Sequence, residues 1–142
     1  MPKQMPKTAP QSEWPEQSGH PFGSQDRTDE YSFILRPDNH GGIGVFAAHA
    51  INKGVALQLS NDDSAFAPRI VSESTIPGEF RKFCIDEGDG MVTRPADFGH
   101  MEMVWFLNHS PDANAAHDEH YIYRALRDIA KGEEITIDYE TL

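Results

Sequence analysis

The segment Ala125-Leu-Arg-Asp-Ile-Ala-Lys-Gly-Glu-Glu-Ile-Thr-Ile-Asp-Tyr139 contains the clearest structural signals in this sequence. Residues 121–126 and 134–138 are rich in β-branched and aromatic side chains, which are typical of β-strands. Residues 128–132 between them predict a turn, in which Gly132 takes the positive φ that other residues avoid. The segment therefore predicts two strands separated by a turn.

Further strands are expected upstream of this segment. Tyr31, Phe33 and Leu35 alternate with their neighbours, and residues 36–42 contain the proline and glycines of a turn. This pattern predicts a hairpin, and the other expected strands cover residues 45–47, 55–59, 81–86 and 91–93. One short helix is expected within residues 95–107, where Met101, Val104 and Trp105 have near-helical spacing. Many short strands with few helices predict a mainly β fold.

The length and the cysteine content limit the kind of domain. A chain of 142 residues has room for one domain, and we expect a flexible N-terminal arm over residues 1–29 followed by a domain over 30–142. Cys84 is the single cysteine, which excludes an intrachain disulfide and a zinc site built from several cysteines. We therefore expect stability to come from a buried apolar core.

The charge and the lack of long apolar runs limit the partners. The chain has 12 basic and 23 acidic residues and a formal charge of −11. This charge opposes direct binding of nucleic acid and favours basic partners. The sequence has no apolar run of membrane-spanning length and no signal-peptide core at its start. We expect a soluble, intracellular protein, with the cytoplasm favoured over the nucleus and no membrane partner.

Three sequence elements together resemble one family. These are Gly42-Ile-Gly-Val-Phe-Ala47, then Phe106-Leu-Asn-His-Ser110 with Asn114 four residues on, then the segment from Ala125 to Tyr139. In this order they resemble the SET-domain protein lysine methyltransferases, over about residues 31–140. The resemblance implies a compact β fold of small twisted sheets, in which the C-terminal strand passes through a loop to form a pseudoknot.

The resemblance also implies a reaction and a set of site residues. S-adenosylmethionine is expected as the cofactor and methyl donor, and the substrate is expected to be a lysine of a basic protein or peptide. The residues implied to bind the cofactor are Gly42, Ile43, Gly44, Phe106, Asn108, His109 and Tyr139. Among these, the backbone of residues 42–44 faces the cofactor, Asn108 and His109 hold its amino-acid and adenine parts, and Tyr139 is the catalytic tyrosine.

The chemistry of these side chains agrees with such a site. An asparagine both donates and accepts hydrogen bonds, so Asn108 suits a ligand end with an ammonium and a carboxylate. Methyl transfer depends mainly on alignment of the amine, the methyl group and the sulfur, and the Tyr139 hydroxyl is expected to help fix that geometry.

Two alternatives compete with this interpretation. A SET-like fold that binds a basic segment without useful turnover is the second functional hypothesis. The other alternative is a metal site, whose candidate ligands are His109, Asp112, His117, Asp118 and His120. These residues fall in a polar loop and His109 is assigned to the cofactor, so no metal is expected.

Some positions depart from the family pattern. Trp105 stands where an arginine is frequent, Ser60 where a tyrosine is frequent, and Ile137 where an aromatic residue commonly precedes the active-site tyrosine by two. Members of the family often close their sites with a C-terminal segment, and this sequence has three residues after Tyr139. We expect the missing wall to come from a homodimer partner, from the substrate, or from Trp14 and Phe22 of the arm.

Overall fold

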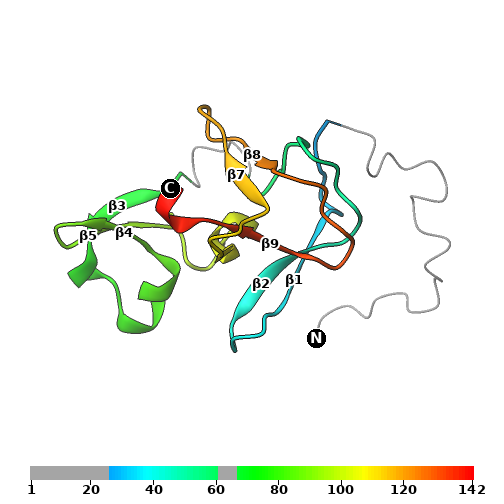
Figure 1. Ribbon diagram of the computed structural model, residues 1–142. Helices are drawn as coiled ribbons and strands as arrows, with labels where there is room; N and C mark the ends of the chain where they lie inside the picture. Colours follow the sequence, from blue (N-terminus) through cyan, green and yellow to red (C-terminus); the bar gives the residue numbers. More distant parts are fainter. Residues whose placement is uncertain (1–25, 61–66) are drawn as a thin grey trace.

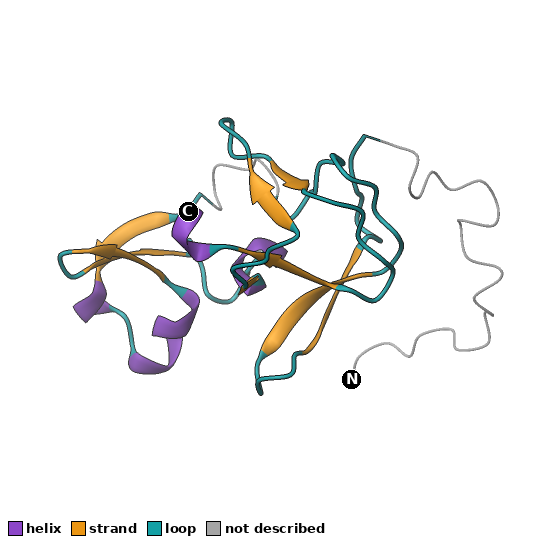
Figure 2. Ribbon diagram, in the orientation of Figure 1, coloured by secondary structure: helices purple, strands orange, loops and turns teal. Residues whose placement is uncertain are grey.

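The structure is a computed structural model that describes residues 26–60 and 67–142. Trp14 and Phe22 of the expected arm lie outside these ranges, as do residues 61–66 of the polar loop. The described chain is mostly strand and loop, with short 3-10 helices (Figure 2). The mainly β fold expected from the sequence is therefore confirmed.

The strands form three small sheets (Figure 1). They are β1 (Phe33–Pro37), β2 (Ile43–Ala47), β3 (Arg69–Ser72), β4 (Ile85–Gly88), β5 (Met91–Arg94), β6 (Asn108–His109), β7 (Ala115–His117), β8 (Tyr123–Ala125) and β9 (Glu134–Ile137). The largest sheet has the order β1-β2-β9-β6, the second has the order β3-β5-β4, and β7 pairs with β8. Strand β9 crosses the middle of the molecule, between the β1–β2 hairpin and the β7–β8 pair.

The helices are η4 (Glu73–Thr75), η5 (Gly78–Phe83), η6 (Met103–Phe106) and η7 (Tyr139–Thr141), all of the 3-10 type. Within the described ranges, none of them has the length and apolar composition needed to cross a lipid bilayer.

The β1–β2 hairpin confirms the hairpin predicted over residues 31–47, although β1 begins after Tyr31 and Leu35 is 40% exposed. Its strands are antiparallel, with Phe33 opposite Ala47 and Leu35 opposite Val45. Phe33, Val45 and Ala47 are buried on one face, as the alternation of the strands requires. The turn contains Gly41, whose φ of +84° is readily available only to glycine.

Strand β9 joins distant parts of the chain. It pairs antiparallel with β2, where Val45 lies opposite Ile135, and parallel with β6, where Asn108 lies opposite Thr136. Ile135 and Ile137 point into the core, which also contains Val45 and Leu107. Strand β8 covers only Tyr123–Ala125 of the strand expected over 121–126, because Tyr121 takes a φ of +61° in a turn. Strand β9 confirms the strand expected over 134–138 except its last residue, and the positive φ of Gly132 is confirmed.

Residues 55–59 do not form the expected strand. The amide of Ala56 donates to the carbonyl of Asp26, whereas the amide of Leu57 donates to the carbonyl of Tyr123. Ala56 bridges Arg27 on one side and Arg124 on the other, and neither pairing continues to a second bridge, so no strand is formed here. The alternation of apolar and polar residues in this stretch corresponds to the buried side chains of Leu57 and Leu59, and not to a ladder of strand hydrogen bonds.

Two other expectations were wrong in part. Residues 81–83 belong to helix η5, and the strand begins only at Ile85, because local bonds such as Cys84 amide to Arg81 carbonyl close 3-10 turns. The helix expected within 95–107 is limited to η6. Residues 97–100 form a tight turn in which Asp97 accepts from the Gly99 amide, and η6 begins at Met103.

Residues just before β1 pack against the domain. Thr28 is buried, its amide donates to the Ala56 carbonyl, and its hydroxyl accepts from the Gln58 amide. Residues 26–29, assigned to the arm on sequence, are therefore ordered against the loop at 56–58.

Segments 51–57 and 129–135 meet at Ile51 and Ile129. Ile51 and Ile129 exchange two backbone hydrogen bonds of 2.8 Å, and both side chains are buried. The amide of Lys53 also donates to the Asp128 carboxylate at 2.8 Å. This contact ties the end of the β1–β2 unit to the turn before β9.

Replacing Ile135 by alanine tests the position of β9 in the core. Its side chain is fully buried, so Ile135→Ala should lower the free energy of unfolding by about 2–5 kcal/mol through lost burial and a cavity. Urea unfolding measures this loss. Ile70→Ala is the matched control, because Ile70 is 64% exposed and its loss should change stability by less than about 0.5 kcal/mol. Equal losses in the free energy of unfolding of both variants would contradict the buried position of Ile135.

Candidate functional site

The turn of the β1–β2 hairpin holds the carboxylate of Asp38 in place. Asp38 Oδ1 accepts from the amides of His40 at 2.8 Å and Gly42 at 2.9 Å. These backbone hydrogen bonds lower the pKa of the Asp38 carboxyl, because they stabilise its charged form. Asp38 is therefore a carboxylate whose second oxygen remains available beyond the turn.

Asn108 reaches this turn from strand β6. Its Nδ2 lies 2.9 Å from Asp38 Oδ2, 2.6 Å from Glu134 Oε2 and 3.3 Å from the Ile43 carbonyl oxygen. All three neighbours are acceptors, so the side-chain NH₂ of Asn108 must face them. We call the set of Asp38, Ile43, Gly44, Asn108 and Glu134 the Asn108 cluster.

This orientation determines what Asn108 offers to a ligand. Its two N–H groups are used by acceptors of the protein, whereas no described residue donates to its Oδ1. From the sequence, the Asn108 side chain was expected both to donate and to accept hydrogen bonds with the ligand. In this arrangement it offers a ligand only an acceptor, which suits an ammonium group and not a carboxylate.

Gly44 is required by the close packing of the Asn108 cluster. A Cβ at this position would overlap the Glu134 carboxylate and lie 3.0 Å from Asn108 Nδ2. The absence of a side chain therefore lets Asn108 and Glu134 approach the backbone of β2.

His109 and Tyr139 form a second group of site residues. The Tyr139 amide donates to His109 Nδ1 at 3.0 Å, and the two rings are tilted with centroids 5.2 Å apart. Because Nδ1 accepts a hydrogen bond, a neutral His109 has its proton on Nε2. The exposed imidazole of His109 thus keeps an N–H donor for a ligand.

The hydroxyl of Tyr139 is directed back to the chain. It donates to the Leu107 carbonyl oxygen at 2.6 Å, and the side chain is about half exposed. Partial burial, together with the nearby Glu134 carboxylate, raises the pKa of Tyr139. The phenol therefore stays protonated at neutral pH, and its oxygen still has a lone pair free to accept.

Asn114 fastens β9 to the start of β7. Only 1% of its surface is exposed, and its amide donates to the Glu134 carbonyl at 2.7 Å and to the Glu133 carboxylate at 3.1 Å. Its Oδ1 accepts from the Thr136 amide at 2.9 Å. Asn114 is therefore a structural residue behind the site.

The structure brings most of the implied residues together. Ile43 and Gly44 lie beside Asn108, Gly42 supports the turn below them, and His109 contacts Tyr139. The ring of Phe106 instead packs edge to face against Phe83, at 5.9 Å, and against the core.

The loop histidines and aspartates do not meet as metal ligands would. Over residues 26–60 and 67–142, no three His, Cys, Asp or Glu side chains are close enough to hold an ion. His117 instead stacks on Tyr121, with centroids 4.7 Å apart, and Asp118 accepts from the amides of His120 and Ile122.

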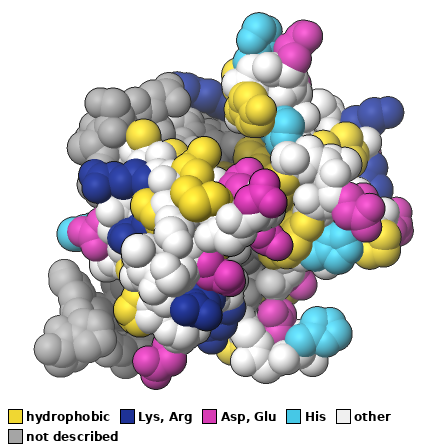
Figure 3. Space-filling model, turned by 90° about the vertical axis from the view of Figure 1, so that its left-hand side faces the viewer, with side chains coloured by type: hydrophobic (Ala, Val, Ile, Leu, Met, Phe, Trp, Pro, Cys, Tyr) yellow, Lys and Arg dark blue, Asp and Glu magenta, His cyan; other side chains and the backbone are white. Residues whose placement is uncertain are grey.

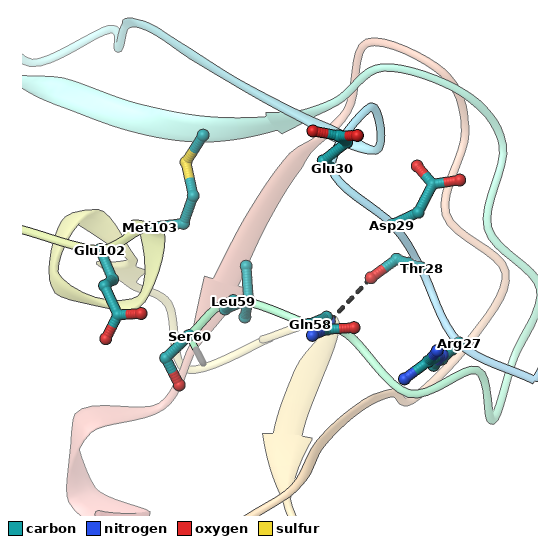
Figure 4. A pocket seen from close by; sticks show the side chains of 9 residues that line it. All are labelled: Arg27, Thr28, Asp29, Glu30, Gln58, Leu59, Ser60, Glu102 and Met103. Carbon is teal, nitrogen blue, oxygen red and sulfur yellow. Dashed lines mark hydrogen bonds between the residues drawn. The ribbon is translucent and has the colours of Figure 1, made fainter. Parts of the chain in front are cut away.

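A separate open hollow of about 450 Å³ lies between the segment before β1, the loop at 58–60 and the start of η6 (Figure 4). It is lined by Arg27, Thr28, Asp29, Glu30, Gln58, Leu59, Ser60, Glu102 and Met103. Three of these side chains are carboxylates, and Leu59 and Met103 add apolar surface. None of the site residues implied by the sequence lines this hollow.

The family model of the SET domain matches residues 42–140. The chain belongs to the SET-domain family. The match begins at the glycine pair of the hairpin turn and ends just after Tyr139, so it contains both groups of site residues except Asp38. Among curated proteins, none matches this SET-domain chain.

Solved structures match this chain at low sequence identity. A Plasmodium falciparum protein described as a histone methyltransferase is 21% identical, with a TM-score of 0.47, and the match covers 78% of this chain and 95% of that one. A humanized mutant of the Chaetomium thermophilum Polycomb Repressive Complex 2, bound to the inhibitor GSK126, is 20% identical with a TM-score of 0.49. The structure of ctPRC2 bound to S-adenosylmethionine is 20% identical with a TM-score of 0.52. Both latter matches cover 78% of this chain and 15% of theirs.

S-adenosylmethionine is the cofactor of SET-domain methyltransferases, and the described residues fit its chemistry. Asn108 Oδ1 is an acceptor that suits the ammonium of an amino-acid end, and the exposed rings of His109 and Tyr139 provide flat surfaces beside it. The carboxylate of that end finds no donor on Asn108, so this part of the expectation from sequence needs another residue.

No role was assigned from the sequence to Asp38, which lies in the expected turn at 36–42, or to Glu134, which lies in the segment from Ala125 to Tyr139. An aspartate two residues before a turn amide is a recognisable signal for a side-chain-capped turn. No local pattern, however, indicates that its second oxygen meets Asn108, 70 positions later.

Replacing Gly44 by alanine tests the packing of the Asn108 cluster. The new Cβ would displace Glu134 and Asn108, so Gly44→Ala should lower the free energy of unfolding by about 1–3 kcal/mol. Gly78→Ala is the control, because its Cβ would meet nothing within 4 Å. Urea unfolding of both variants provides the comparison. A Gly44→Ala protein as stable as Gly78→Ala would contradict this packing, because it would show that the Asn108 cluster accepts a Cβ.

Proposed function

We propose that this protein transfers a methyl group from S-adenosylmethionine to a lysine side chain of a basic protein or peptide. The observation that carries the proposal is the arrangement of Asn108, His109 and Tyr139 within a SET domain. Strand β6 presents the first two residues, and parallel strand β9 leads directly into the third. We also propose that β9, lying between β2 and β6, forms the pseudoknot that the resemblance implies.

The chain's residues would hold the two ends of the cofactor differently. Asn108 Oδ1 would accept from its ammonium group, and the backbone of residues 42–44 would line the same side. His109 would present its ring and its Nε2–H to the adenine end. When bound, S-adenosylmethionine supplies a methyl group on a positively charged sulfur.

Tyr139 would align the reacting groups. Its proton is engaged by the Leu107 carbonyl, so the phenolic oxygen acts as an acceptor. That oxygen would accept a hydrogen bond from the N–H of a neutral lysine amine and direct its lone pair to the methyl group. Such alignment is worth up to about 7–11 kcal/mol of a two-reactant barrier.

A basic substrate agrees with the charge of the protein. The chain has a net charge of −11, and acidic side chains lie near the centre of the face in Figure 3, among exposed hydrophobic ones. The hollow adds Asp29, Glu30 and Glu102 beside apolar Leu59 and Met103. This combination suits the aliphatic stem and the cationic head of a basic side chain.

Binding and turnover can be tested in one series. Isothermal titration calorimetry with S-adenosylmethionine measures binding, and mass spectrometry of histones and ribosomal proteins incubated with the protein and cofactor measures methylation. Mass gains of 14 Da on lysines, expected for one methyl group each, would support the proposal. Cofactor or peptide binding without methylation would instead support a SET-fold binding module. Light scattering on the same samples checks the predicted homodimer.

Replacing Tyr139 by phenylalanine tests its proposed role. The variant loses only the hydroxyl, so we expect most methyl transfer to disappear while the dissociation constant for S-adenosylmethionine changes by no more than a few fold. Tyr123→Phe is a matched control, because Tyr123 is also a partly buried tyrosine but lies in β8 and packs on His117. Unchanged turnover of Tyr139→Phe would remove Tyr139 from the catalytic residues.

A further inference from the structure

The Asp38–Asn108 hydrogen bond connects two segments that are 70 residues apart. Each oxygen of the Asp38 carboxylate has a different task. Oδ1 accepts from the amides of His40 and Gly42 and so closes the hairpin turn, whereas Oδ2 accepts from Asn108 Nδ2 at 2.9 Å. The turn therefore fixes the position of Asp38 Oδ2, the oxygen that accepts from Asn108.

The orientation of the Asn108 amide depends on this acceptor. A flipped amide would place Oδ1 against the Asp38 and Glu134 carboxylates, where it would be repelled and would leave Asp38 Oδ2 and Glu134 Oε2 without the Asn108 donor. Glu134 comes from strand β9 and has a longer, more flexible side chain, whereas Asp38 is held by its own turn. Asp38 is thus the more rigid of the two carboxylates.

We propose that Asp38 is a positioning residue that keeps the Asn108 oxygen turned toward the amino group of the cofactor. This inference rests on the proposed function, because it concerns the same cofactor site. Asp38 acts through Asn108 and is not itself assigned a contact with the cofactor. Its effect should therefore appear only with ligands that have the amino-acid end.

Asp38→Asn is the variant that separates the two tasks of the carboxylate. An asparagine has one side-chain oxygen, which can satisfy the turn amides or Asn108 but not both. With the oxygen on the turn, its NH₂ would face the NH₂ of Asn108, so the Asn108 amide would turn away from its present orientation.

Calorimetry with two ligands measures the consequence. S-adenosylhomocysteine has the amino-acid end, whereas 5′-methylthioadenosine has the same nucleoside without it. We expect Asp38→Asn to weaken S-adenosylhomocysteine about tenfold, which is the loss of roughly one hydrogen bond to a charged group, and to leave 5′-methylthioadenosine unchanged.

Asp86→Asn is the matched control. Asp86 also closes its own turn, since its Oδ1 accepts from the Gly88 amide at 2.8 Å, but it has no contact with the Asn108 cluster. It should leave the affinity for both ligands unchanged. A thermal unfolding curve for each variant shows whether the hairpin still folds.

A double-mutant cycle with Asn108→Ala decides whether Asp38 acts through Asn108. If it does, Asp38→Asn should have no further effect on S-adenosylhomocysteine binding once Asn108 is alanine. Additive losses, equal losses for both ligands, or an unchanged affinity in Asp38→Asn would each overturn the inference while leaving the proposed function intact. A wild-type protein that binds neither ligand would overturn the proposed function and this inference together.

Discussion

The fold depends on the pairing of one short strand, β9, with two partners from distant parts of the chain. It bonds antiparallel to β2 and parallel to β6, and its residues Ile135 and Ile137 fill the core between them. A strand of four residues cannot stay in place through its own ladder bonds. Buried Asn114 adds bonds to the backbone at both Glu134 and Thr136 and fixes the register of the strand.

The two faces of strand β9 have different roles, one in the core and one beside Asn108. Ile135 and Ile137 face the core, whereas Glu134 and Thr136 point the other way. On that second face Glu134 meets Asn108 beside Gly44, and the strand then leads to Tyr139. The same strand that completes the core therefore places a carboxylate at one end of the site and the tyrosine at the other.

Local patterns predicted elements well where the hydrogen bonds are also local. The β1–β2 hairpin and the glycine at position 132 follow from turn chemistry and alternation, and both are present. The stretch 55–59 has an equally good alternation but makes no ladder, because its pairings with Arg27 and Arg124 are single bridges that do not extend along the chain. Strand β6, two residues long, is too short to produce any periodic signal.

The sequence by itself determined the mainly β class, the hairpin and the SET-domain family, because each follows from side-chain types at fixed local spacings. It also supplied Asn108, His109 and Tyr139 as candidate site residues. Only the tertiary structure decided how Asn108 is oriented, because its three acceptors come from a turn 70 residues earlier, strand β2 65 residues earlier and the neighbouring strand β9 26 residues later. A hydrogen bond between residues so far apart depends on how the strands are packed, and no local pattern contains that information.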